Sequence, residues 1–322
     1  MRRLLVAPEL APVAALLIVW LFFALAGGAA FRSVAGTAAY FDAAAPLGIL
    51  TVAVALLMIG GEFDLSIGSM IGVSGMSVML LTVEAGWPLG AAIPATLVLC
   101  AAIGLANGLL VVGTSVPSFL VTLGTLFVLR GLVIALSRLL TGRTQISGVD
   151  TTSAWHAVLA SDLGPVRISV LWWVVLTVLA TWLLRRTRAG NWIYAAGGSA
   201  EAARNAGVPV RRVKVSLFVM TALAAALVGI MQAVRFTGAD ALRGEGQEFR
   251  AIIAAVIGGT LLTGGYGTAV GAALGALIFG MVQQGIVITG VDADWFQVFL
   301  GAMLIAAVLV NDFARRRALR ST

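Results

Sequence analysis

The sequence predicts an all-α membrane protein, a single bundle of about ten transmembrane helices over residues 1–322, and three observations favour this fold class. Hydrophobic residues make up 60% of the chain and charged residues 11%, whereas soluble domains carry about 25% charged residues. The mean hydropathy is +1.04. Uncharged stretches close to the roughly 20 residues that a spanning helix needs recur along the chain. We therefore expect the lipid bilayer to surround most of the chain.

The spans follow from the uncharged stretches and their breaks. Two uncharged runs, 85–129 and 251–291, are too long for one span, and we expect breaks at 113–118 and 258–267. The first stretch, 10–31, follows a basic end as in a signal peptide, but its 22 uncharged residues suffice for a retained first helix. The expected spans are 10–28, 46–60, 65–82, 88–112, 118–140, 168–184, 213–234, 250–264, 267–290 and 295–313.

The basic residues predict which end of the bundle meets the cytoplasm. The formal net charge is +7, and the positive residues lie between hydrophobic segments, which indicates membrane orientation rather than nucleic-acid binding. Thirteen of the 21 basic residues lie in the segments 2–3, 185–214 and 315–320, separated by even numbers of expected spans. The positive-inside rule makes these segments, and both termini, cytoplasmic. The loops at about 141–167 and 235–249 are then extracytoplasmic.

Two acids interrupt the hydrophobic sequence in "GGEFDLSIGS", residues 60–69. Asp64 suits the N-cap of the following helix, where its carboxylate accepts from free N–H groups and the positive helix end favours the ionised form. This structural role accounts for Asp64, which can also line a pathway. No such structural role explains Glu62. An acid inside the hydrocarbon region of the membrane must face water, protein or a partner. A cytoplasmic rim position and a pathway position are both open for Glu62.

Arg130 and Asn107 are further polar residues inside apolar runs. Arg130 lies near the middle of the expected span 118–140, where a guanidinium needs carboxylates, carbonyls or water. Glu62 and Asp64 are candidate partners for it. Asn107 is expected to hydrogen-bond across helices.

Small residues recur at four-residue spacing, a pattern that lets helix backbones approach closely in a bilayer. We expect helix packing at Gly68, Gly72, Gly104, Gly108, Gly267, Gly271 and Gly275. The two short spans that end in glycines, 46–60 and 250–264, also resemble each other, because "GSMIG" and "GTAVG" each follow a Gly-Gly pair. An internal repeat with a pathway at its broken helices explains this, and chance similarity of glycine-rich helix starts explains it equally.

The most informative polar stretch is the basic segment 185–213, which contains "GGSAEAARNAGVPV". Ser199 suits an N-cap, the residues after it are good helix formers, and Gly207 with Pro209 ends the helix. We expect a cytoplasmic helix of about two turns. Such order in a loop indicates docking on another protein, and the alternative is a solvated loop with an incidental helix.

The sequence shows none of the residue patterns that are typical of enzymes and metal sites. The only lysine, Lys214, lies in "RRVKVS" and not in a phosphate-binding loop. The single histidine, His156, and single cysteine, Cys100, form no zinc cluster and no catalytic triad. We expect no cofactor and no metal. If ATP drives transport, another chain binds it.

Four stretches in order resemble the membrane permease subunit of ribose-type ABC sugar importers. They are "GGEFDLSIGS", "GLANGLLVVGTSVPSFLVTLGTLFVLRG", "GNWIYAAGGSAEAARNAGVPV" and "FRAIIAAVIGGTLLTGGYGTAVGAALGALIFG", and the resemblance runs from about residue 46 to 313. Two residues depart from the family pattern. Glu62 stands where the family has an apolar or small residue, which leaves the substrate in doubt, and Tyr266 departs similarly in the second glycine-rich motif.

The resemblance implies an inner-membrane complex with several partners. These are a second permease subunit, alike or different, an ATPase dimer in the cytoplasm and a periplasmic solute-binding protein. It further implies that the segment from Ser199 to Gly207 is the coupling helix to the ATPase, with Ala203 inside it and Glu201 and Arg204 on its polar surface. With Glu62 and Arg130 added, the candidate translocation path comprises Glu62, Asp64, Ser66, Asn107 and Arg130.

We therefore expect the permease subunit of an ATP-driven importer that moves a sugar or polyol by alternating access. One alternative is an ion-coupled secondary transporter that uses Glu62 and Asp64 as ion sites. A second alternative is an ABC permease for an amino acid or another small solute. A membrane enzyme is disfavoured because the chain lacks catalytic residues.

Overall fold

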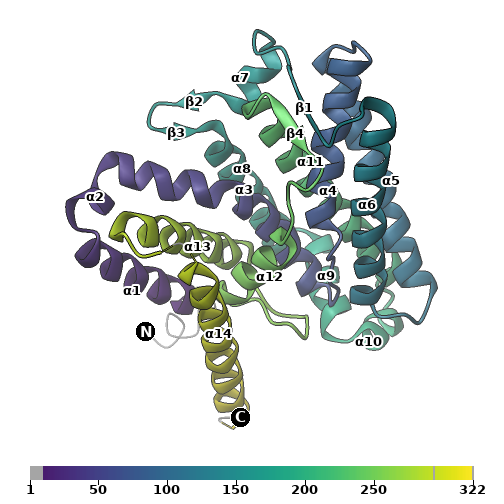
Figure 1. Ribbon diagram of the computed structural model, residues 1–322. Helices are drawn as coiled ribbons and strands as arrows, with labels where there is room; N and C mark the ends of the chain where they lie inside the picture. The colour runs from purple at the N-terminus through teal and green to yellow at the C-terminus, as the bar shows by residue number, and fades with distance from the viewer. Residues whose placement is uncertain (1–9, 293, 321–322) are drawn as a thin grey trace.

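A computed structural model shows a bundle of helices and describes residues 10–292 and 294–320 (Figure 1). Within these residues, seven helices are long and apolar enough to cross a membrane. They are α3 (Val34–Ile59), α4 (Ile67–Met79) with the π-helical turn η1 (Leu80–Glu84), α5 (Leu89–Gly113), α6 (Ser118–Thr141), α8 (Ile168–Arg186), α11 (Val210–Arg235) and α13 (Ala269–Thr289). The predicted all-α membrane bundle is confirmed.

Three further helices complete the hydrophobic part of the described chain: α1 (Leu10–Ala26), α12 (Gln247–Ile257) and α14 (Trp295–Arg320). The remaining elements are short. They are α2 (Gly28–Arg32), α7 (Ala154–Ala160), α9 (Arg188–Gly198), α10 (Ala200–Asn205), β1 (Gln145–Ser147), β2 (Asp162–Leu163), β3 (Val166–Arg167) and β4 (Gly238–Asp240).

Each of the ten expected spans overlaps one of these ten helices, but several of the expected bounds are wrong, including the start of α3, the end of α12 and the end of α14, which continues to Arg320. Helix α3 begins at Val34 rather than near residue 46, because the Ser33 side chain caps it by accepting the Gly36 N–H at 2.9 Å. It has 26 residues and is not a short span. Helix α12 ends at Ile257 rather than near residue 264, because Gly259 adopts a φ of +86° that stops the helix.

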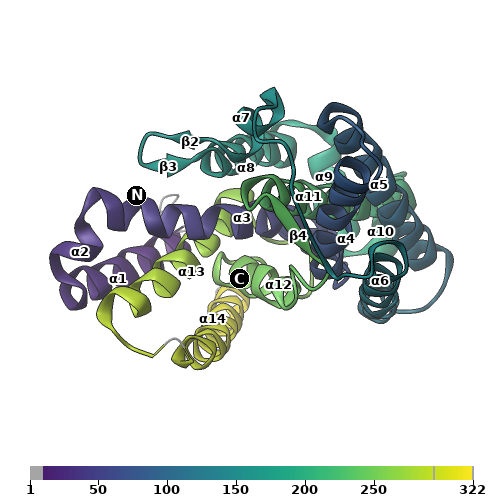
Figure 2. The same cartoon turned by 45° about the horizontal axis from the view of Figure 1, so that its top comes forward.

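The central helices α3 and α11 hold the bundle together. In Figures 1 and 2, α1 and α13 lie on one side of α3, while α4, α5 and α6 lie on the other side, next to α11. The second half of α3 is buried almost without interruption from Leu47 to Ile59. A helix that is apolar on all faces is expected at such a position.

The loops 141–167 and 235–249 meet at one end of the bundle, drawn at the top of Figure 1. Strand β1 pairs with β4 in an antiparallel register that sets Gln145 opposite Asp240. The Arg235 guanidinium donates to the Ala160 carbonyl oxygen at 2.7 Å and pairs with Asp162 at 3.0 Å. Helix α10 and the end of α14 lie at the opposite end.

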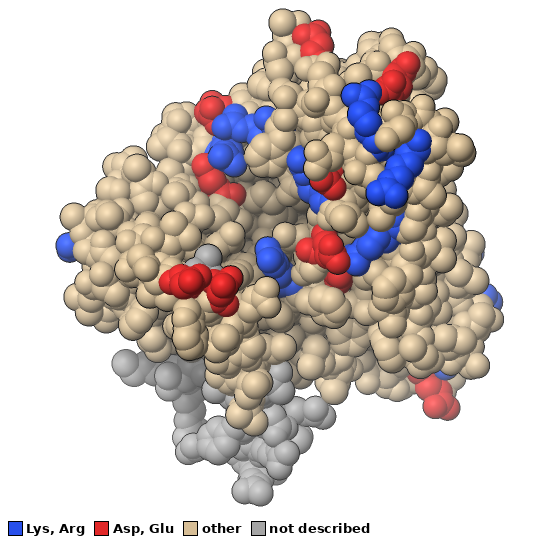
Figure 3. All heavy atoms as spheres, viewed as in Figure 1, with Lys and Arg blue, Asp and Glu red and all other residues tan. Residues whose placement is uncertain are grey.

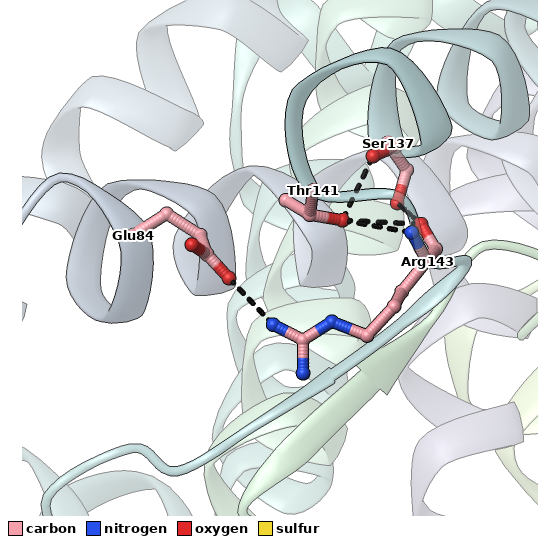
Figure 4. A network of polar contacts seen from close by, with 4 residues as sticks. All are labelled: Glu84, Ser137, Thr141 and Arg143. Carbon is pink, nitrogen blue, oxygen red and sulfur yellow. Dashed lines mark hydrogen bonds and ion pairs between the residues drawn. The ribbon is translucent and has the colours of Figure 1, made fainter.

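At the end of the bundle where the two loops meet, a polar network ties the π-helical turn η1 to the end of α6 (Figure 4). The Arg143 guanidinium contacts the Glu84 carboxylate at 3.3 Å. The Ser137 hydroxyl donates to the Arg143 carbonyl oxygen at 2.5 Å, and the Thr141 hydroxyl accepts the Arg143 N–H at 3.2 Å. These bonds satisfy backbone groups just beyond the last turn of α6, where no helical partner is left.

The glycines at four-residue spacing lie where backbones touch. An added Cβ at Gly104 would lie 2.7 Å from the Phe218 carbonyl oxygen of α11, and one at Gly108 would lie 2.9 Å from the Val215 Cα. At Gly271 and Gly275 an added Cβ would overlap carbonyl oxygens of the α12 end. Gly267 has a φ of +145°, which side-chain-bearing residues rarely adopt. Close packing at these positions thus requires the absence of a side chain.

We predict that Gly275→Ala destabilises the bundle by about 1–3 kcal/mol, the usual penalty for overpacking, because its methyl group would overlap the Ala254 carbonyl oxygen. The matched control is Gly124→Ala in α6, where an added Cβ has nothing within 4 Å. The midpoint of thermal unfolding in detergent micelles measures both. Equal midpoints for the two variants would contradict the packing role of Gly275.

Candidate functional site

A break between α3 and α4 carries the polar sequence 62–66 into the bundle. Helix α3 ends in three bonds, from Gly60 N to Leu56 O, from Gly61 N to Met58 O and from Glu62 N to Leu57 O. Gly61 has a φ of +82°, the left-handed conformation that this helix ending needs. The chain then runs without helical bonds until Ile67, so its backbone groups must find partners elsewhere.

Helix α6 supplies these partners from its side chains. The Phe63 N–H donates to the Ser118 hydroxyl oxygen at 3.1 Å, and the Leu65 N–H donates to the Thr122 hydroxyl oxygen at 3.0 Å. In return the Ser69 hydroxyl donates to the Leu126 carbonyl oxygen at 2.8 Å. The hydroxyl groups on one face of α6 thus replace the bonds that a continuous helix would make.

Asp64, Ser66 and Asn107 come together in one buried cluster. Asp64 is 1% exposed, and one carboxylate oxygen accepts both the Ser66 N–H at 2.9 Å and the Ser66 hydroxyl at 2.6 Å. Its other oxygen accepts the Thr221 hydroxyl of α11 at 2.7 Å. The Asn107 amide donates to the Ser66 oxygen at 3.0 Å, and its own oxygen accepts the Thr125 hydroxyl at 2.7 Å. The cluster links α4, α5, α6 and α11.

The predicted N-cap role of Asp64 is wrong in its register. Ser66 occupies the N-cap position of α4, and its side chain accepts no bond from the helix. The Asp64 carboxylate instead binds the N–H of Ser66 itself, in the turn before the helix. The acid therefore fixes the turn that leads into α4.

Glu62 pairs with Lys214 near the start of α11, and both side chains are largely buried. We considered Glu62 and Asp64 as partners of Arg130, and neither contacts it. Sequence reasoning missed the Glu62–Lys214 pair, although one signal was present. Lys214 is the only lysine of the chain and stands at the edge of an expected span, where it needs a partner if it lies inside the bundle.

Arg130 binds two acids that sequence reasoning also missed. Its guanidinium lies 3.1 Å from the Glu245 carboxylate and 4.0 Å from the Glu248 carboxylate. Gly68 makes room for this arrangement, since an added Cβ there would overlap a Glu248 carboxylate oxygen. Gly68 therefore contacts a buried side chain as well as backbone.

A second break, between α12 and α13, repeats the geometry of the first. Helix α12 ends in bonds from Gly258 N to Ala254 O, from Gly259 N to Val256 O and from Thr260 N to Ala255 O. These three bonds have the same spacing as those that end α3. The Gly259 φ of +86° matches the Gly61 φ of +82°. The Gly-Gly pairs that sequence reasoning aligned thus end two helices in the same way.

The end of α9 touches both breaks. Gly265 N donates to the Ile59 carbonyl oxygen at 2.8 Å, which joins the two breaks directly. An added Cβ at Gly197 would overlap that same carbonyl oxygen and would lie 2.8 Å from Gly265 N. The Tyr194 hydroxyl donates to the Gly267 carbonyl oxygen at 2.8 Å. The segment just before α10 is therefore packed against both discontinuities.

The short helix expected in the segment 185–213 is present as α10. The Ser199 hydroxyl caps it by accepting the Ala202 N–H at 3.3 Å. The helix ends with Gly207 at a φ of +81°, after which the Val208 N–H donates to the Ala203 carbonyl oxygen. Ala203 is buried, whereas Glu201 and Arg204 are exposed. One side of α10 thus faces the bundle and its charged side faces outward.

The chemistry available at these sites is that of hydrogen bonds and charge. Among the residues that the structure describes, no group of three His, Cys, Asp or Glu side chains is arranged to hold a metal ion. Cys100 is buried in α5 with a free thiol. The polar groups can hold a backbone segment in place or contact a polar solute.

Comparisons with known proteins point to one family. The family described as "Branched-chain amino acid transport system / permease component" matches residues 36–308. The xylose transport system permease protein XylH of Escherichia coli is 30% identical over 95% of this chain and 92% of its own length. The ribose import permease protein RbsC of Escherichia coli is 33% identical over 82% of this chain and 81% of its own.

A third relative extends the range of solutes. The autoinducer 2 import system permease protein LsrC of Photorhabdus laumondii is 33% identical over 87% of this chain and 81% of its own length. No solved structure matches the chain significantly.

We predict that Glu62 and Lys214 stabilise the bundle as a pair. Either Glu62→Gln or Lys214→Met leaves one partly buried charge without its partner, whereas the double variant removes both charges. Thermal unfolding in detergent should give a coupling energy of about 1–3 kcal/mol, as for hydrogen bonds between charged groups.

The exposed pair of Arg143 and Glu84 is the matched control, with side chains 65% and 36% exposed. Its double-mutant cycle should give a coupling near zero to about 1 kcal/mol, as surface ion pairs do. Strictly additive effects of Glu62→Gln and Lys214→Met would show that the coupling energy of the buried pair is no larger than that of the exposed pair.

Proposed function

The chain belongs to the family of permease components that is described for branched-chain amino acid transport systems, and from this membership we propose that it carries a sugar or polyol into the cell. The chain is the transport subunit of an ATP-driven importer and not an enzyme. The observation that supports the solute class is the 30% identity to a xylose permease over 95% of the chain. The ribose permease adds a second pentose to the same class.

The alternatives have less support. An amino acid solute rests on the wording of the family description alone. An ion-coupled transporter would need free acids in the membrane, but Glu62 is bound to Lys214 and both Asp64 oxygens accept hydrogen bonds. Binding an ion at either acid would first require breaking these contacts.

For the membrane topology we propose ten membrane-embedded segments in the inner membrane, with both termini in the cytoplasm. Seven helices have crossing length, and α1, α12 and α14 supply the rest. The pairing of β1 with β4 supports a position of the loops 141–167 and 235–249 on the same side of the membrane. In the proposed topology these loops follow α6 and α11, which cross the membrane in the same direction. Arg2 and Arg3 lie outside the described residues, and the side chains of the basic tail 315–320 are likewise not described.

The partners that this function requires are a second permease subunit, a pair of ATPase subunits and a periplasmic binding protein. We place the ATPase against α10, the coupling helix, which projects at the end of the bundle opposite the two loops (Figure 1). Glu201 and Arg204 on its exposed side are suited to contact a partner, and buried Ala203 fixes it to the bundle. Ser199 and Gly207 define its two ends.

Movement of α10 can reach the interior by two routes. One runs through α11, which begins five residues after α10 and carries Lys214 and Thr221, the partners of Glu62 and Asp64. The other runs back through Gly197, which contacts both breaks. ATP binding by the partner would shift α10, and the two breaks would let the bundle switch between outward and inward access. Asp64, Ser66 and Asn107 hold the first break beside the path.

The topology predicts a difference in labelling from outside intact cells. Thr151→Cys in the first extracytoplasmic loop should react with a membrane-impermeant thiol reagent, and Asn205→Cys at the end of α10 should react only after the membrane is opened. Both positions are exposed, and in cells that express the chain without its ATPase nothing covers α10, so accessibility depends on the side of the membrane alone. The wild type is the background control because Cys100 is buried. Labelling of Asn205→Cys from outside would overturn the topology.

The coupling role predicts that Ala203→Pro uncouples the importer. The Ala203 N–H donates to the Ser199 carbonyl oxygen at 2.9 Å, and proline removes that bond and costs a helix roughly 3 kcal/mol. In proteoliposomes with the complete importer, uptake of D-xylose or D-ribose should fall by at least about tenfold while the partner still hydrolyses ATP.

Charge reversal gives a second test of the same contact. Glu201→Arg should lower uptake, and the matched control Asp150→Arg, an exposed acid in the loop at the other end of the bundle, should not. Normal uptake by both Ala203→Pro and Glu201→Arg would remove the coupling role. Uptake by the chain without its ATPase would contradict an ATP-driven mechanism altogether.

A further inference from the structure

Arg130 lies at the middle of α6, so its charge is far from both membrane surfaces. The helix has 24 residues, and Arg130 is the thirteenth. At a rise of 1.5 Å per residue it lies about 18 Å from either end. The hydrocarbon core of a bilayer is about 30 Å thick. Arg130 and the groups that it contacts are therefore at membrane depth.

Glu245 shows that this side of α6 does not face lipid. Its carboxylate lies 3.1 Å from the Arg130 guanidinium, yet its side chain is 59% exposed. An ionised carboxylate at this depth must meet water or protein, because its transfer to hydrocarbon is strongly unfavourable. Phe127 and Val128 of the same helix are equally exposed, at 63% and 58%, and are apolar. Helix α6 thus has an apolar surface beside a charged one.

The chain between β4 and α12 reaches Arg130 by descending along α4. Residues 241–246 form no helix or strand. An added Cβ at Gly72 would lie 2.6 Å from the Ala241 carbonyl oxygen, and one at Gly68 would lie 2.9 Å from the Gly244 carbonyl oxygen. Irregular backbone at membrane depth is tolerated where it is covered by protein or lines a water-filled cavity. This descent also explains why α12 is so short.

Two polar atoms of the cluster make no hydrogen bond, although Arg130 and Glu248 form an ion pair at 4.0 Å. The second terminal nitrogen of Arg130 and one carboxylate oxygen of Glu248 are buried and make no hydrogen bond. Glu248 as a residue is 2% exposed. A buried donor without a hydrogen bond is unfavourable. The Arg130 guanidinium thus keeps an unused donor beside the Glu245 and Glu248 carboxylates, and a group that accepts from the guanidinium and donates to a carboxylate can use it.

The charges around Arg130 decide which solute the cluster can bind. In Figure 3, acidic and basic side chains lie close together in the region where Figure 1 draws α4, α6 and α12. Arg130, Glu245 and Glu248, which we call the Arg130 cluster, carry a formal charge of −1 when ionised. An anionic solute is disfavoured by this charge. A hydroxyl group both accepts from a guanidinium and donates to a carboxylate.

We propose that the Arg130 cluster is a solute-contacting site half-way across the membrane, which binds the hydroxyl groups of a neutral polyhydroxylated solute. The site rests on the proposed function, since it names the groups that a sugar would meet inside the permease. Vicinal hydroxyls of the solute bridge the guanidinium of Arg130 and the carboxylates of Glu245 and Glu248. The buried cluster of Asp64, Ser66 and Asn107 does not contact the solute.

Accessibility to a water-soluble reagent tests where the cluster lies. In proteoliposomes with the complete importer, Glu245→Cys should react with a charged methanethiosulfonate reagent, while Phe127→Cys and Val128→Cys should not. Saturating D-ribose or D-xylose with the binding protein should slow the reaction of Glu245→Cys, and the modified protein should lose uptake. An unreactive Glu245→Cys, or modification that leaves uptake intact, would overturn the proposal.

Transport by charge-neutral variants tests solute contact. Arg130→Gln and Glu248→Gln should lower uptake of the same pentoses by roughly tenfold to a hundredfold, the range for losing a hydrogen bond to a charged group. Arg130→Lys keeps the charge and should lose less. Glu84→Gln, which removes the acid of an ion pair at the end of the bundle, is the matched control and should transport normally.

The controls separate this site from the proposed function. If the wild type takes up neither pentose with ATP and binding protein, the proposed solute class fails. If the wild type transports and the Arg130 and Glu248 variants fold and transport equally well, only the site fails. Folding is judged by the midpoint of thermal unfolding and by binding-protein-stimulated ATP hydrolysis, which a solute contact alone should not abolish.

Discussion

The structure depends on satisfying the backbone of the chain where its helices break inside the membrane. A polar backbone group without a partner is costly in hydrocarbon, and residues 63–65 make no helical bonds. Hydroxyl groups from α6 and the turn fixed by Asp64 supply the missing partners. This requirement explains why serines and threonines line one face of α6. It also explains why an ionisable residue, Asp64, is buried at this position. The glycines at both breaks provide the backbone conformations that the turns need.

The two breaks work as one unit because they are bonded to each other and to the segment before α10. The Ile59 carbonyl oxygen accepts from Gly265 and is covered by Gly197. A displacement of α9 and α10 therefore cannot leave one break unchanged while it moves the other. The Glu62–Lys214 pair adds a link from α11 to the first break. A small shift of α10 would therefore reach both breaks through contacts of backbone with backbone, and closely packed backbone deforms little.

The sequence was sufficient for the helices and insufficient for their contacts. Apolar length predicted that each hydrophobic stretch holds a helix, although not where α3 begins or α12 ends, and propensity with a capping serine predicted α10 at Ser199. The ion pairs could not be predicted, because Glu62 and Lys214 are 152 residues apart and nothing local specifies which helices are neighbours. The descent of 241–246 along α4 was missed for the same reason, so Arg130 was assigned the wrong acids. Asp64 was wrongly assigned to the N-cap of α4, which Ser66 occupies two residues later. A shift of one or two residues separates the cap from the turn before it, and the sequence alone does not locate helix ends that finely.

The contrast between the two polar clusters explains how a path can pass a sugar without trapping it. Both Asp64 carboxylate oxygens, and both the amide nitrogen and the amide oxygen of Asn107, have hydrogen-bond partners, so a solute there would have to break these bonds. In the Arg130 cluster the Glu245 carboxylate is exposed, and water can bind it whenever no solute is present. Exchanging water for a hydroxyl changes the free energy little, because the two make similar hydrogen bonds. Such weak binding is what a transport path requires, since a solute that binds must also leave.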